Sequence, residues 1–195
     1  MRSISRVIVL LLAIGGLFTS AFAGGADEFL NAISKEEYPV AGKEYYARHC
    51  FMYEDGTHIT TNYWRGTLVP INSKIKVEVL TSNKLILRVL ETGESVEVDN
   101  ASKYTKCDLR TIARRMLAAE PVDLQDFDKD IAAAIKSGTM RLGMTKTQVL
   151  MARGFPPAHK TPTLVSDRWQ VWPSRYVVQT LVFSDDKLIE ARGVD

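Results

Sequence analysis

The sequence predicts an α+β protein in two parts: a small antiparallel β-barrel-like half over 42–120, then two helices and a three-stranded antiparallel sheet over 121–195. Three observations lead to this fold class. Residues 42–99 alternate between apolar and polar in short runs separated by turn signals, which is typical of small barrels and rolled sheets. From 107 onward the apolar spacing changes to the helical period. After 167 strand-like alternation returns, which gives the second part its sheet.

Residues 1–23 have the three parts of a secretory signal peptide. Arg2 and Arg6 form a basic head, residues 7–17 are almost wholly apolar, and the triplet Ala21-Phe22-Ala23 follows. We expect cleavage after Ala23 and export to the periplasm. The alternative, an uncleaved membrane anchor, would need about 20 apolar residues.

Residues 24–41 are interpreted as a leader segment. Gly24 and Gly25 stand where a lipoprotein would carry its acylated cysteine, so the sequence predicts no direct lipid anchor. Contact with the outer membrane would then be peripheral.

The charge balance argues against a nucleic-acid partner. The chain has 25 basic and 23 acidic residues, and cleavage would remove Arg2 and Arg6, so the mature chain would carry equal numbers of each. A protein without net charge has no overall field to attract nucleic acid. The three histidines show no metal-ligand spacing, and we expect no metal, cofactor or small-molecule substrate.

The two cysteines, Cys50 and Cys107, would enter an oxidising compartment, where an even count favours a disulfide. Closing a loop of about 55 residues would stabilise the fold by roughly 4 kcal/mol. The sequence equally allows two buried free thiols, since sequence separation does not fix the distance between the two Cα atoms.

The β half is expected to begin with a hairpin around Asp55-Gly56, because this pair is a strong signal for a tight two-residue turn. Alternating strands are predicted at 74–80, 85–90 and 95–99. An amphipathic helix follows with Asp108 as its N-cap and ends before Pro121.

The second part is expected to start with a helix over 124–136 that Gly138 ends. A shorter helix follows. Thr145 and Gln148 form a capping box at its start, and Gly154 ends it. We expect Val149 to face inward, because a helix of about nine residues is stable only when packed against other elements.

Three strands should complete this part, with turns at Pro173-Ser174 and Asp185-Asp186. Trp169 and Trp172 differ in parity on the first strand, so one of them should point away from the helices. An exposed aromatic side chain there would be a good anchor for a partner protein.

These residues carry a resemblance to the BamE/SmpA/OmlA family of outer-membrane assembly proteins. The matching positions are Gly143, Met144, Thr145, Gln148, Val149, Gly154, Pro156, Trp169, Val182, Phe183, Asp185 and Leu188. The resemblance implies two helices on a three-stranded sheet and a role in protein–protein contact. The chain departs from the family by lacking the lipidated cysteine, by Arg153 and Phe155 around the glycine, and by its extra β-rich half. That half faintly resembles Src-homology-3-like barrels, and the residues that carry this resemblance are Gly66 and Pro70.

The sequence therefore predicts a non-catalytic envelope protein that binds other envelope proteins, in outer-membrane assembly or maintenance. Binding would use the open face or an edge strand of the last sheet, with Trp169 and Trp172. A lipid- or peptidoglycan-associated barrel is one alternative, and two others remain. One is an exported enzyme that uses Cys50 and His58, which lie close if the hairpin register allows it. The other is an exported protein inhibitor, suggested by the related fold of β-lactamase-inhibitor proteins.

Overall fold

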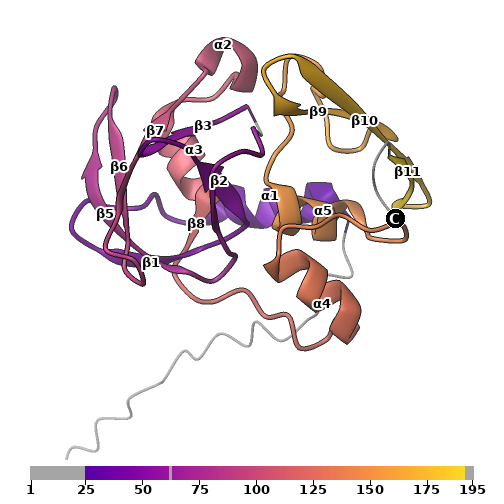
Figure 1. The fold of residues 1–195 in the computed structure, drawn as a ribbon, viewed down its shortest axis with the longest axis horizontal. Coiled ribbons are helices and arrows are strands. Elements are labelled where there is room, and N and C mark those ends of the chain that lie inside the picture. Colours follow the sequence, from indigo (N-terminus) through magenta and orange to yellow (C-terminus); the bar gives the residue numbers. More distant parts are fainter. Residues whose placement is uncertain (1–24, 62, 192–195) are drawn as a thin grey trace, which may run out of the picture.

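The computed structural model describes residues 25–61 and 63–191. The expected signal peptide and its cleavage position lie outside these residues. Within the described part the protein is a mixed α+β fold with five helices and several sheets, none of which closes into a barrel. Figure 1 shows the N-terminal strands on one side of the molecule, the last three strands on the other, and helices α1 and α5 between them. No helix in the described part is both long enough and apolar enough to cross a membrane.

The N-terminal half contains a six-stranded sheet in the order β3-β7-β6-β5-β1-β8. Its strands are β1 (Glu44–Ala47), β3 (Thr57–Ile59), β5 (Lys74–Leu80), β6 (Leu85–Val89), β7 (Ser95–Asp99) and β8 (Leu117–Ala118). A separate two-stranded sheet pairs β2 (Phe51–Tyr53) with β4 (Thr67–Val69). All these pairs are antiparallel except β3 with β7, which is parallel.

The barrel-like prediction for this half is therefore wrong. The turn at Asp55-Gly56 is present, with both residues at positive φ and two backbone hydrogen bonds between Glu54 and Thr57. The strands on either side of that turn then separate into different sheets. The sheet remains open because, among the strands of the described residues, β3 at one end pairs with no strand except β7, and β8 at the other end pairs with none except β1.

Strand alternation builds one core in this half. Ile75 and Val77 of β5 point inward with Leu87 of β6 and Val96 of β7, and all are buried. Helix α3 (Leu109–Met116) covers them, and Asp108 caps it by accepting from Thr111 N–H at 2.7 Å, as predicted. A short helix, α2 (Ser102–Thr105), precedes it.

The C-terminal half contains two helices and a three-stranded antiparallel sheet. Its elements are α4 (Lys129–Lys136), α5 (Lys146–Arg153), β9 (Arg168–Ser174), β10 (Val177–Ser184) and β11 (Lys187–Ala191). The strand order is β11-β10-β9. The inward side chains, among them Trp169, Leu181 and Phe183, form the second core with the helices.

The predicted caps of α5 are present. Gln148 N–H donates to Thr145 Oγ1 at 3.1 Å, and Thr145 N–H donates to Gln148 Oε1 at 2.8 Å, which together make the capping box. Gly154 ends the helix at φ 75°. Val149 is buried, so this short helix is held by tertiary packing as expected.

Two boundaries in this half differ from the prediction. Helix α4 begins at Lys129, because Gln125 N–H donates to Asp123 Oδ1 and forms a turn that precedes the helix. The turn between β9 and β10 lies at Arg175-Tyr176, so Pro173 and Ser174 still belong to β9. Because Pro173 lies on an edge strand, its missing N–H costs the sheet no hydrogen bond.

A helix in the expected leader segment was not predicted. Helix α1 (Ala26–Lys35) buries Ala26, Phe29 and Ile33 in the C-terminal core, where it contacts α5. The spacing of these three apolar residues and the acidic first turn are the signals that would have identified it. Cys50 and Ile71 of the N-terminal half also enter this core, so segments from outside 121–195 complete it.

Candidate functional site

The two tryptophans named as partner-binding residues lie on opposite faces of the C-terminal sheet. Trp169 is fully buried and packs against Phe183, with ring centroids 4.7 Å apart. Trp172 is half-buried and contacts His159 at 5.0 Å between ring centroids. Trp169 thus belongs to the core, and of the two only Trp172 is available to another molecule.

Both edges of this sheet are already occupied along part of their length. On the β9 side, Trp64 N–H donates to Pro173 O and Gln170 N–H donates to Thr161 Oγ1. On the β11 side, Leu188 O accepts from Gly143 N–H, and Leu188 N–H donates to Met144 O. These contacts block the addition of a further strand at those positions.

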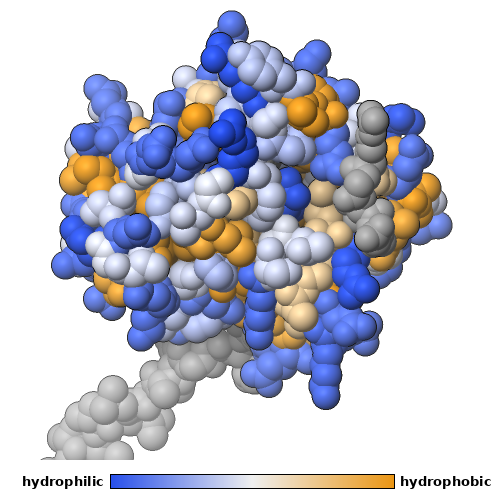
Figure 2. Space-filling model, in the orientation of Figure 1, coloured by the Kyte–Doolittle hydropathy of each residue, from blue (hydrophilic) through white to orange (hydrophobic). Residues whose placement is uncertain are grey.

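The face of this sheet that points away from the helices carries apolar side chains. We call it the outer sheet face and define it by Trp172, Val178, Val182 and Ile189. Val178 is 50% exposed and Ile189 is 53% exposed. Tyr176, at the neighbouring hairpin tip, is 85% exposed. In the view of Figure 2 the molecule shows hydrophobic residues as separate small groups among hydrophilic ones.

A row of three aromatic rings joins the outer sheet face to the N-terminal half. Tyr104 of α2 lies 4.8 Å from His159, and His159 lies 5.0 Å from Trp172. His159 N–H also donates to Tyr104 O at 3.0 Å. Burial, followed by the nearby charges of Lys160 and Lys106, lowers the pKa of His159. The corner beside Trp172 is thus aromatic and positively charged.

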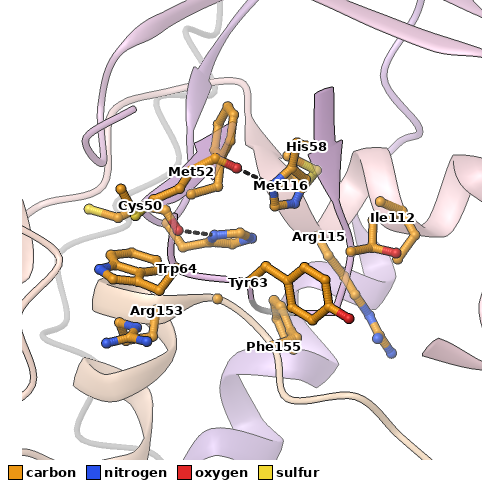
Figure 3. A pocket seen from close by; sticks show the side chains of 14 residues that line it. Cys50, Met52, His58, Tyr63, Trp64, Ile112, Arg115, Met116, Arg153 and Phe155 are labelled. Carbon is orange, nitrogen blue, oxygen red and sulfur yellow. Dashed lines mark hydrogen bonds between the residues drawn. The ribbon is translucent and has the colours of Figure 1, made fainter. Parts of the chain in front are cut away.

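A second candidate site is a cavity of about 40 Å³ between the two halves (Figure 3). Its walls come from the β1–β2 region, β3, α3, the end of α5 and the segment around Tyr63 and Trp64. The lining residues are His49, Cys50, Phe51, Met52, His58, Thr60, Tyr63, Trp64, Ile112, Arg115, Met116, Arg153, Gly154 and Phe155.

The fold brings Cys50 and His58 to this one cavity, as the rival enzyme hypothesis required, and His49 lies there as well. His49 Nδ1 lies 2.8 Å from Cys50 O, and His58 Nδ1 lies 2.7 Å from Met52 O. Burial lowers the pKa of both imidazoles to about 4, so both are neutral at physiological pH. A neutral ring that faces a carbonyl must donate through Nδ1, which leaves Nε2 as an acceptor.

Cys50 is not arranged as a nucleophile. Its thiol donates to Ile135 O at 3.1 Å and accepts from Ile71 N–H at 3.2 Å. Burial raises the pKa of this thiol to about 11, so the reactive thiolate is disfavoured. Figure 3 shows its sulfur turned away from the centre of the cavity.

The predicted disulfide is absent from the structure, where Cys50 and Cys107 are both free thiols. The physical reason is that the two side chains belong to different cores. Cys50 is part of the C-terminal core, whereas Cys107 packs against the N-terminal one.

Two arginines are among the lining residues, and the guanidinium group of each stacks on an aromatic ring. Arg153 lies 4.0 Å from the centroid of Trp64, and Arg115 lies 5.0 Å from that of Phe155. Burial lowers the pKa of Arg153 to about 10, so it remains charged at neutral pH.

Two glycines allow this close packing. A Cβ at Gly154 would lie 2.9 Å from the His49 ring, and one at Gly138 would lie 2.3 Å from the Trp64 ring. Both glycines were predicted only as helix-ending residues. Their second role follows from contacts between distant segments, which local sequence patterns do not contain.

The other residues of the segment around α5 contribute to the packing of this helix and its connection to the sheet. Backbone hydrogen bonds join the start of α5 to β11 through Gly143, at φ 85°, and the buried Met144. Pro156 is buried after the end of the helix. Sequence reasoning missed Arg115, Arg153 and Phe155 as cavity residues. It also gave no role to His159, because the aromatic partners of this ring come from separate segments.

No model of a protein family, no curated protein and no solved structure matches this chain.

Proposed function

We propose that this protein is a non-catalytic, exported envelope protein that binds another protein through the outer sheet face. The observation that carries the proposal is the apolar character of that face, where Val178 and Ile189 are each half exposed on a sheet whose inner face is fully packed. The signal-peptide pattern at the N-terminus supports export. The resemblance of residues 121–195 to outer-membrane assembly proteins supports a role in protein contact.

The partner is a protein whose contacting surface is apolar at its centre and acidic at its rim. The apolar centre would cover Val178 and Ile189. The acidic rim would meet Lys106 and Lys160, whose charges lie close enough to His159 to lower its pKa. Trp172 lies between these two regions and has the residue type that most often dominates interface energies.

The thiol contacts weigh against the rival enzyme. A Cys–His mechanism needs a thiolate that is close to a base and open to substrate. Cys50 is fully buried, and its hydrogen bonds and raised pKa hold it as a thiol.

Two matched variants test the proposal. Val178→Asp places a charge on the outer sheet face, and Val40→Asp places the same charge at a valine of equal exposure, 51% against 50%, in the N-terminal half. Both proteins are tagged, expressed with their own N-terminus and purified from the envelope fraction after mild cross-linking.

We expect Val178→Asp to lose a discrete partner that the wild type and Val40→Asp retain, by about tenfold or more, since a buried unpaired charge costs several kcal/mol at an interface. Identical partner sets for the two variants would contradict the proposed surface.

A further inference from the structure

We propose that the cavity between the two halves binds a small oxyanion that carries its own O–H group, of which hydrogen phosphate is the simplest example. This site is separate from the outer sheet face, and the proposal does not depend on the proposed function. It rests on the charge, the hydrogen-bonding capacity and the size of the cavity.

The charge of the lining is positive. Arg115 and Arg153 both line the cavity, and no aspartate or glutamate belongs to its lining within the described residues. Arg115 forms no salt bridge there, and its buried Nε has no hydrogen-bond partner in the described part of the chain. A guanidinium whose buried Nε lacks a hydrogen-bond partner is an energetically costly arrangement that a bound anion would relieve.

The two imidazoles add acceptors to this positive environment. His49 and His58 each use Nδ1 to donate to a backbone carbonyl, which leaves Nε2 of each neutral ring as an acceptor. An anion with only acceptor oxygens would be repelled by these lone pairs. An anion that keeps an O–H can donate to one of them while its other oxygens accept from arginine. Hydrogen phosphate therefore fits, and sulfate, which has the same shape but no proton at neutral pH, does not.

The size of the cavity fits a compact ion. One water needs roughly 10–15 Å³ of such space, so about 40 Å³ holds a few oxygen atoms. The walls are also fixed in place, because Phe155 packs on Arg115 and the His49 ring sits against Gly154. A rigid, preformed site of this kind loses little entropy when it binds a ligand.

Isothermal titration calorimetry of the purified protein with sodium phosphate and sodium sulfate, at equal ionic strength in chloride, tests the proposal. We expect saturable binding of one phosphate per chain, at least tenfold tighter than sulfate. Arg115→Gln should weaken phosphate binding by about tenfold or more. The matched control is Arg110→Gln on the same helix, where the exposed Arg110 stacks on Tyr38 instead, and it should leave binding within about twofold.

His58→Asn tests the acceptor. Asparagine can keep an N–H donor toward Met52 O, but it lacks the lone pair of the histidine Nε2. The ratio of the dissociation constants for sulfate and phosphate should therefore fall toward one in this variant. If this variant unfolds, the wild type provides the same information by ¹⁵N NMR of its histidine rings. Phosphate should shift Nε2 of His49 or His58 and leave His159 unchanged.

The proposal is overturned if phosphate shows no saturable binding, or if phosphate and sulfate bind equally. It is also overturned if Arg115→Gln and Arg110→Gln weaken binding to the same degree, because that result would indicate attraction by overall charge alone.

Discussion

The two sheets of this protein follow the same alternation but present opposite chemistry on their outer faces. On the N-terminal sheet many of the outward residues are charged or polar, although Ile86 also points outward. Arg88 Nε donates to Glu78 Oε1 at 2.6 Å, Ser95 donates to the other oxygen of Glu78, and Lys84 pairs with Glu97. On the C-terminal sheet the corresponding positions include valine and isoleucine.

This difference separates a solvent face from the proposed contact face. A row of cross-strand charge pairs is stable in water and discourages association. Single exposed apolar residues are ordinary, but several on one sheet face mark a site of interaction. The comparison therefore supports the outer sheet face, and no part of the N-terminal sheet, as the surface for a partner protein.

The largest expected effect comes from the inner face. Trp169→Ala should lower the free energy of unfolding by about 3–5 kcal/mol, because it empties the centre of the C-terminal core. Trp172→Ala on the outer face should cost only about 1 kcal/mol, the value of its ring contact. Urea unfolding measures both. Equal losses would mean that the two faces are not distinguished as described.

The next effect concerns the junction between the two halves, where His49 and His58 are buried neutral. Their pKa values in the folded protein are about 4, below the 6.5 of an exposed histidine. The unfolded chain therefore binds protons that the folded chain does not, and stability should fall as the pH drops from 6.5 to 4. Each histidine contributes up to about 3 kcal/mol to this loss.

Urea unfolding across this pH range checks the prediction, with His58→Asn as the variant that removes one of the two contributions. The slope of stability against pH should decrease by somewhat less than half in the variant, because His159, whose pKa is also lowered, adds a contribution of its own. An unchanged slope would contradict the assignment of the pH dependence to these two rings.

A smaller effect on the free energy of unfolding is expected at the N-terminus of helix α5. Thr145→Ala removes the side-chain half of the capping box and should cost about 1 kcal/mol, measured by urea unfolding. Thr145→Ser keeps the hydroxyl and should remain within about 0.5 kcal/mol of the wild type. A serine variant as unstable as the alanine one would assign the loss to packing of the methyl group.

The smallest effects separate the two outer faces by their response to salt. Glu78→Gln should lower the melting temperature slightly, and added salt should reduce this difference because the pair with Arg88 is screened. Val178→Thr should stay within about 0.5 kcal/mol of the wild type at every salt concentration. Thermal unfolding at low and high salt compares the two variants. A salt-dependent effect of Val178→Thr would contradict the claim that the two outer faces differ in charge.

Local chemistry made much of the fold predictable. The Asp108 cap, the Thr145–Gln148 capping box, the helix-ending Gly154 and the Asp185-Asp186 turn depend on residues a few positions apart, and the structure contains each of them. The parity of Trp169 and Trp172 followed from strand geometry alone.

What could not be predicted depends on contacts between distant segments. The strands that flank Asp55-Gly56 separate because each finds a partner elsewhere in the chain. Helix α1 packs in a core formed mostly by residues more than 90 positions away. The cavity likewise joins His49, Arg115 and Arg153 from three separate elements, so no local pattern indicated it.

Site-specific photo-cross-linking in intact cells tests the central claim most directly. A benzophenone amino acid is placed at Val178, at Ile189 and at the equally exposed Val40. The account predicts a discrete covalent adduct with one partner protein from positions 178 and 189 and none from position 40. Adducts from position 40 alone, or from no position on the C-terminal sheet, would contradict it.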